Sequence, residues 1–412
     1  MGAPRGTIAS RITVSTRAAS RATRAAPASL SRLVERFDHD VFDLPGERVV
    51  IRLLTTGGEG WDVVVDRERA KLSACPQGEA DATLAADPAT WNSIAQDVAS
   101  GMDAFRSGRL SMRQNMHLGV GFLAATSAMS GPGRLRFRRV ETRMGKFSTL
   151  EAGTGRPVLM LHGLGATKAS FLPTVAALAP SFRTIAVDLL GFGDSDKPLG
   201  ASYSPRYHAR GIAELLDALE LERAHFVGHS MGGRVALEVG FRHPARTIGL
   251  VLMTPAMAWL RERRWAPYLR WIRPELGLIQ IAPRSVVEAF IRRIIPGADS
   301  AWGASGIDEF VRTYTTPRGR AAFYAAARHI YLDEPHGDEG FWTQLRTLAP
   351  QSLFIWGRHD RLAPTSFINH VERALPAARH IELDCGHLPQ IERPREAHAA
   401  IAKFLTSVKP IR

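Results

Sequence analysis

The segment that most constrains the fold is residues 226–233, Phe-Val-Gly-His-Ser-Met-Gly-Gly. Residues 224–227 are mainly apolar, like a short strand, and residues 234–242 carry apolar side chains at helical spacing. The pattern therefore predicts a sharp strand-to-helix turn with Ser230 at its tip. Glycines two positions before and two after the serine remove Cβ atoms that would clash in so tight a turn. Such a turn holds the serine Oγ above the edge of a sheet.

The length and composition of the chain set further limits. A chain of 412 residues is too long for one ordinary core and predicts two domains, and 45% hydrophobic with 23% charged residues is a globular composition. No apolar run is long enough to span a membrane, and the N-terminus lacks the apolar core of a secretory signal, so we expect a cytoplasmic protein. Cys75 and Cys385 fall in different predicted domains. This argues against a disulfide framework or a cysteine-rich metal site, and we expect no metal or cofactor.

The formal charge of +13 is concentrated partly in residues 1–34, which contain six arginines and no acidic residue. We interpret this segment as a disordered basic arm. Two hypotheses remain for it: peripheral contact with anionic membrane or a targeting role, or a solvated tail without a partner. The chain has no zinc-finger spacing and no aromatic–basic RNA-binding strand motif, so we do not expect nucleic acid as a partner.

Residues 35–130 form the first predicted domain. Residues 48–55 and 61–66 are expected to pair as strands across a glycine-rich turn, with two further strands at 70–74 and 82–85. Asp87-Pro88 has the pattern of an N-cap followed by a first-turn proline, and the domain is expected to end in an apolar helix over residues 117–129.

This domain resembles the sterol carrier protein type-2 family. The matching residues are Trp61, Ala82-Thr83-Leu84, Trp91, Ala104-Phe105-x-x-Gly108 and Leu110-x-Met112. The resemblance implies a small α+β fold with a tunnel for sterols or fatty acyl chains, and a filled core is the alternative. Where the family has a glycine before Asn or Asp, this chain has Gln114-Asn115, and we expect Asn115 to accept the left-handed geometry of that turn.

The second predicted domain covers residues 135–412. After a hairpin over residues 137–151, apolar strands alternate with amphipathic helices up to the Ser230 turn. This alternation predicts an α/β fold with a mostly parallel sheet covered by helices on both faces. Carboxyl ends of parallel strands share one edge, so residues that follow different strands are expected near Ser230.

Three such loops supply candidate partners for the serine. His162-Gly163-Leu164-Gly165 follows a strand, and we expect the Leu164 and Met231 N–H groups to form an oxyanion hole. Asp360 and His387 follow the strands at 352–356 and 380–383 and are the predicted acid and base. Residues 254–260 contain no carboxylate that could replace Asp360.

Other polar residues near these loops are interpreted as structural. We expect His162, His229 and His359 to be structural rather than second bases. In the loop 188–196, Phe192 is expected to line the pocket, and the carboxylates are expected to satisfy local N–H groups.

These motifs together resemble the α/β-hydrolase family. They are His162-Gly163-x-Gly165, Asp188-x-x-Gly191-x-Gly193-x-Ser195, Gly228-His229-Ser230-Met231-Gly232-Gly233, Gly357-x-x-Asp360 and Gly386-His387. The resemblance implies an α/β-hydrolase fold and the chain order Ser230, Asp360, His387. It also separates the chain from haloalkane dehalogenases and epoxide hydrolases of this fold, which have an aspartate in place of Ser230 at this turn, called the nucleophile elbow.

Residues 256–349 form a predicted helical cap between two strands. Its first half carries Trp259, Trp265 and Trp271 among many arginines. One hypothesis is docking at a bilayer, since Trp and Arg suit the headgroup interface; the other is an ordinary cap with inward-packed tryptophans.

The expected reaction is hydrolysis of a hydrophobic small-molecule or lipid ester by two-step acyl transfer. Three alternatives stay open: hydrolysis of C–C bonds or thioesters by the same fold, incidental cofactor-free haloperoxidase activity, and lipid binding or transfer with a vestigial hydrolase domain. The sequence makes no prediction of oligomeric state.

Overall fold

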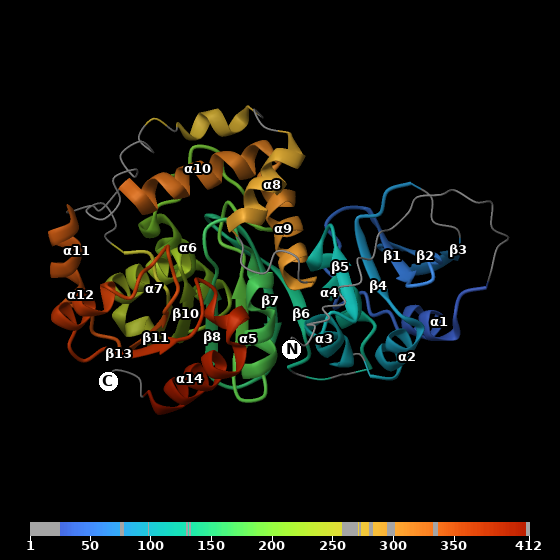
Figure 1. Ribbon diagram of the computed structural model, residues 1–412, viewed down its shortest axis with the longest axis horizontal. Helices are drawn as coiled ribbons and strands as arrows, with labels where there is room; N and C mark the ends of the chain where they lie inside the picture. The colour runs from blue at the N-terminus through green and yellow to red at the C-terminus, as the bar shows by residue number, and fades with distance from the viewer. Residues whose placement is uncertain are drawn as a thin grey trace, which may run out of the picture.

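The computed structural model describes residues 25–74, 78–97, 99–128, 131, 133–257, 271, 273–279, 283–294, 301–332 and 337–408. Two β-sheets, each with its own helices, lie side by side (Figure 1). One apolar cluster contains residues of both parts, including Phe42 and Phe122 from the first and Phe137 and Leu150 from the second. The two parts are therefore joined through a packed apolar interface.

The first sheet has the strand order β3-β2-β1-β4-β5. The predicted hairpin is confirmed, because β1 pairs antiparallel with β2, placing Ile51 opposite Val63. Alternate β1 side chains are buried, as a sheet with one covered face requires. The strands are β1 (Arg48–Thr55), β2 (Gly60–Asp66), β3 (Ala70–Ala74), β4 (Ala82–Ala86) and β5 (Leu110–Arg113).

Four helices belong to this sheet: α1 (Ala28–Glu35), α2 (Pro88–Gln96), α3 (Ala99–Arg106) and α4 (Met116–Ala125). The predicted cap of α2 is confirmed, since the Asp87 side chain accepts a hydrogen bond from the Thr90 N–H. Trp91 and Ile94 on α2 are buried in the core.

Helix α1 corrects the expectation of a disordered arm over residues 1–34. Leu30 and Leu33 lie one turn apart and are fully buried in the core of the first domain. The arginine-rich composition of residues 1–34 favours disorder, and two leucines are too few to indicate a helix by periodicity. Residues 1–24, which carry most of the predicted arm, lie outside the described residues.

The turn before α4 also differs from the prediction. Gln114, not Asn115, takes the left-handed conformation, with φ 65°. Asn115 is extended, and its side chain accepts a hydrogen bond from the Leu118 N–H as the N-cap of α4. Capping needs the extended backbone, so the left-handed residue moves one position earlier.

The second sheet has the order β13-β12-β11-β10-β8-β9-β7-β6, with the six strands from β8 to β13 mutually parallel. This confirms the α/β prediction. Side chains of β8 alternate between two apolar clusters, Val158 and Met160 in one and Leu159 and Leu161 in the other, so both faces are covered. The strands are β6 (Arg136–Thr142), β7 (Gly145–Ala152), β8 (Pro157–Leu161), β9 (Arg183–Val187), β10 (Ala224–His229), β11 (Thr247–Met253), β12 (Ser352–Gly357) and β13 (Arg379–Leu383).

The helices of this domain outside the cap are η1 (Lys168–Phe171), α5 (Leu172–Leu178), α6 (Pro205–Ala218), α7 (Met231–Arg242), η2 (Pro244–Arg246), α12 (Phe367–Ala374), α13 (Pro389–Glu392) and α14 (Pro394–Ser407). Between β11 and β12 the chain forms η5 (Pro274–Leu278), α8 (Arg284–Ile294), α9 (Ala301–Tyr314), α10 (Pro317–Leu332) and α11 (Gly337–Leu345). These elements lie within the predicted cap; α8 and α10 are at the top of Figure 1, and α11 is at its left edge, next to α12.

The bilayer hypothesis rests largely on residues that the structure does not describe. Trp259 and Trp265 lie outside the described residues, whereas Trp271 is described and 81% exposed. Among the described residues, no helix has the length and apolarity needed to cross a membrane.

Candidate active site

Ser230 lies at the tip of the turn between β10 and α7. Its backbone angles are φ 52° and ψ −114°, a conformation that non-glycine residues rarely adopt. Hydrogen bonds hold it there: its N–H donates to the Met253 carbonyl at 2.9 Å, and its carbonyl accepts from the Arg234 and Ala256 N–H groups. A Cβ at Gly232 would overlap the Leu161 carbonyl, so this position requires glycine. The predicted strained elbow is therefore present.

The loop after β8 lies directly against this serine. A Cβ on Gly163 would be 3.3 Å from the Ser230 Cβ and 2.9 Å from His229 Nδ1. Among the described residues, neither the Leu164 N–H nor the Met231 N–H has an acceptor in the protein. The two predicted donors thus belong to the two backbone segments next to Ser230: Leu164 to the loop after β8, and Met231 to the start of α7.

His162 is fully buried beside this loop. Its Nδ1–H donates to the Gly163 carbonyl at 2.8 Å, and Nε2 accepts from the Leu189 N–H at 3.0 Å, which defines the neutral tautomer. Burial lowers the pKa of His162. Both ring nitrogens are thus used structurally, in agreement with the prediction.

The predicted acid and base are hydrogen-bonded to each other. His387 Nδ1 lies 2.7 Å from Asp360 Oδ2, and Asp360 Oδ1 accepts from the Leu362 and Ala363 N–H groups at 2.7 and 3.0 Å. Burial alone would raise the pKa of Asp360, but the His387 contact and the two amides hold it below its ordinary value. Asp360 is thus an anion that accepts the His387 Nδ1–H and fixes the orientation of the ring.

The His387 loop has supports that the sequence analysis did not identify. Glu392 accepts hydrogen bonds from the Gly386 and Leu388 N–H groups, at 2.8 and 2.9 Å, on both sides of His387. His229 Nε2 contacts the His387 carbonyl at 2.7 Å, and Thr254 Oγ1 donates to the same oxygen. The sequence signal for Glu392 is a carboxylate within α13, the short helix that follows the histidine turn.

The remaining structural histidines agree with the prediction. Burial lowers the pKa of His229 to about 3, so its ring is neutral at physiological pH. His359 is mostly exposed and contacts Asp384 at 2.8 Å. His229 and His359 therefore contact the His387 carbonyl and Asp384, and not the Asp360 carboxylate.

The loop 188–196 differs from its prediction in two respects. Phe192 is 1% exposed and packs against the His162 ring, so it belongs to the core and does not line a pocket. Asp188 accepts hydrogen bonds from the Asp194 N–H at 2.8 Å and the Lys168 N–H at 2.6 Å, and the side chains of both aspartates also bind the buried Lys168 ammonium, at 2.6 and 3.0 Å.

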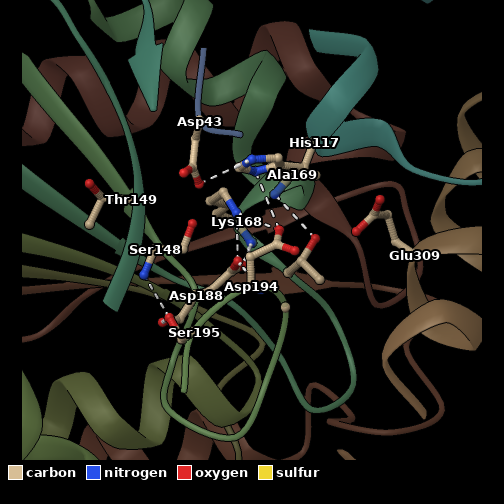
Figure 2. A network of polar contacts seen from close by, with 12 residues as sticks. Asp43, His117, Ser148, Thr149, Lys168, Ala169, Asp188, Asp194, Ser195 and Glu309 are labelled. Carbon is tan, nitrogen blue, oxygen red and sulfur yellow. Dashed lines mark hydrogen bonds and ion pairs between the residues drawn. The ribbon is translucent and has the colours of Figure 1, made fainter. Parts of the chain in front are cut away.

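These charges belong to a network that joins the two domains (Figure 2). The His117 ring of α4 lies 3.3 Å from Asp194 and 3.4 Å from Asp43. Arg312 of α9 also binds Asp194, at 2.7 Å. The aspartates raise the pKa of Lys168 against the opposing effect of burial, so the lysine is charged. No local sequence pattern connects these residues, because they come from distant parts of the chain.

The arrangement defines a class of protein: an α/β fold with a strained serine elbow, a glycine-containing loop packed against it and a histidine–aspartate pair. The alpha/beta hydrolase fold family matches residues 156–394, and the chain belongs to this family. The SCP-2 sterol transfer family matches residues 26–124, so the first domain is of that kind.

Comparison with individual proteins agrees with this assignment. The chain is 30% identical over 261 residues to a 2-hydroxymuconate semialdehyde hydrolase from Pseudomonas sp. strain CF600, covering 62% of this chain and 88% of the relative. A membrane phospholipase A structure is 25% identical with a TM-score of 0.52, covering 66% of this chain and 86% of that one. An enol-lactonase from Burkholderia xenovorans, 22% identical with a TM-score of 0.55 over 66% of this chain and 100% of that one, shares the fold.

Proposed function

We propose that this protein hydrolyses carboxylic esters of apolar acyl groups, with Ser230 as nucleophile, His387 as general base and Asp360 as its orienting acid. The observation that carries the proposal is the 2.7 Å contact between His387 and Asp360 at the same sheet edge as the strained Ser230. Each residue follows a different parallel strand, and the three occur in the chain order typical of this fold.

The proposed reaction proceeds through an acyl-enzyme. His387 Nε2 takes the Ser230 proton as Oγ attacks the ester carbonyl, and the Leu164 and Met231 N–H groups bind the resulting oxyanion. The C–O bond to the alcohol then breaks, and His387 gives its proton to that oxygen. Water repeats the sequence on the acyl-serine, with His387 taking its proton, and releases the carboxylic acid.

Two observations support an apolar acyl group. Phe310 and Phe323 pack on Gly165 in the predicted oxyanion loop, and Tyr314 stacks on Phe310 with ring centroids 5.2 Å apart. Aromatic side chains beside the reacting group favour hydrocarbon over polar groups. The structure described as a membrane phospholipase A is also consistent with a lipid-like ester.

A second candidate is hydrolysis of a C–C bond next to a carbonyl. It is favoured by the similarity to 2-hydroxymuconate semialdehyde hydrolase. The same serine, histidine and N–H groups can serve that reaction, so the geometry of the elbow does not separate the two candidates.

We expect kcat/KM for p-nitrophenyl esters to rise about tenfold or more from acetate to octanoate, because burial in the transition state of only about two of the added methylenes, at roughly 0.8 kcal/mol each, already gives that factor. The measurement is an ester series from acetate to palmitate on the full chain, with 2-hydroxymuconate semialdehyde as the C–C probe. Turnover of the semialdehyde with none of any ester would replace the ester proposal with the second candidate. Ester turnover confined to acetate would contradict the apolar preference.

A further inference from the structure

Helix α9 of the cap lies beside β5 of the first domain (Figure 1) and contacts it through buried carboxylates. Asp308 accepts hydrogen bonds from Arg113 Nε at 2.7 Å and from the Gln114 N–H at 2.9 Å. Glu309 accepts from the Met116 N–H at 2.6 Å. Asp308 and Glu309 are 5% and 4% exposed, so these bonds are largely shielded from water. The contact is therefore specific and not a loose surface encounter.

Two of these contacts bind backbone N–H groups of the first domain, those of Gln114 and Met116. Gln114 has a left-handed backbone that is costly for a residue with a side chain, and Asp308 binds its N–H. Met116 begins α4, whose first N–H groups have no partner within the helix, and Glu309 binds one of them. Negative charge is also favourable at a helix N-terminus. The cap helix thus completes a strained turn of the first domain.

The same helix also covers the predicted oxyanion loop, through Phe310, the residue after Glu309. Gly165 has φ 73°, and a Cβ there would lie 2.5 Å from Phe310 Cε2 and 3.1 Å from Phe323 Cε2. Phe310 directly follows Glu309, so the acidic contact and the aromatic contact occupy adjacent positions of one rigid helix. A shift of α9 at the domain interface would therefore move the Phe310 ring over the loop that carries Leu164.

A second buried contact fixes the helix further along. Arg312 binds both Glu309, at 2.9 Å, and Asp194, at 2.7 Å. Asp194 also contacts Lys168 and faces His117 of the first domain, at 3.0 and 3.3 Å. Figure 2 shows Asp194, Lys168 and His117 close together, with Glu309 of the cap to one side. The position of α9 is thus set by charges from all three parts of the chain.

We propose that the first domain is a positioning element for the acyl pocket: by holding α9 through Asp308 and Glu309, it sets where Phe310 lies over the oxyanion loop. This makes Phe310 a specificity-determining residue and Arg113 a positioning residue that acts through α9. The inference rests on the proposed function, and it gives the first domain a role that requires no bound lipid.

The test uses the full chain with Arg113→Ala, Phe310→Ala and both changes together. The readout is the ratio of kcat/KM for p-nitrophenyl octanoate to that for p-nitrophenyl acetate. We expect each single change to alter this ratio about tenfold in the same direction, within the range typical of coupled sites, and the double variant to differ little from Phe310→Ala. Arg52→Ala is the matched control, because it breaks a partly buried Arg–Asp pair within the first domain, at 2.8 Å, away from α9.

Labelling by a small fluorophosphonate separates this inference from the proposed function. An unlabelled wild-type protein would refute Ser230 chemistry itself. If the variants are labelled, three results would overturn the positioning role. The octanoate-to-acetate ratio could be unchanged in Arg113→Ala, the two effects could multiply in the double variant, or Arg52→Ala could change the ratio as much as Arg113→Ala does. Should Arg113→Ala fail to fold, Ser305→Ala provides the same test, since its hydroxyl donates to the Met112 carbonyl of the first domain.

Discussion

Replacing Ser230 with alanine should lower kcat for p-nitrophenyl esters by about 10⁶, close to the complete loss of covalent catalysis. The variant keeps the strained turn, because the bonds that hold it come from the Ser230 backbone and not from its hydroxyl. It loses only the atom proposed to attack the carbonyl. Steady-state kinetics with a substrate turned over well by the wild type would measure the effect.

The thermal unfolding midpoint is the control for Ser230→Ala. Alanine fits the same backbone and removes no buried contact, so we expect a midpoint close to that of the wild type. Retention of more than a percent of the activity by a folded Ser230→Ala variant would contradict the proposed nucleophile.

Replacing Asp360 with asparagine should lower kcat by about 10⁴ through the wrong histidine tautomer. The Leu362 and Ala363 N–H groups both donate to Oδ1, so an asparagine at this position would place its carbonyl oxygen there. Its amide nitrogen would then face His387 Nδ1 in place of Oδ2. An NH₂ group can only donate at that contact, which forces the His387 proton onto Nε2 and prevents it from accepting the serine proton.

Asp384→Asn is the matched control, because Asp384 also binds a histidine, His359, but on an exposed surface. We expect that variant to retain activity close to the wild type. An Asp360→Asn variant as active as Asp384→Asn would show that the buried pair does not orient a catalytic base. Both variants are compared by kcat at the pH of maximal wild-type activity.

The geometry of the candidate site was largely predictable because its signals are local. The elbow needs glycines at fixed offsets from Ser230, and the structure explains each, since Gly228 and Gly232 approach backbone too closely for a Cβ. Asp360 and His387 were placed by their positions after parallel strands, whose ends necessarily share one edge. Pattern and topology together bring these residues to one place.

What the sequence did not predict depends on contacts between distant segments. Lys168, Asp194, Arg312 and His117 come from four separate segments of the chain, three helices and one loop, and no spacing rule relates them. The burial of Leu30 and Leu33 could not be predicted either, because it depends on the core that the rest of the first domain forms around them.

The central claim, that Ser230 is the nucleophile, is tested most directly by mass spectrometry after treatment with a fluorophosphonate. The account predicts one phosphonyl group per chain, on the peptide that contains Ser230, and none on the Ser230→Ala variant. Modification at another serine, or an unmodified wild-type chain that still hydrolyses esters, would contradict it.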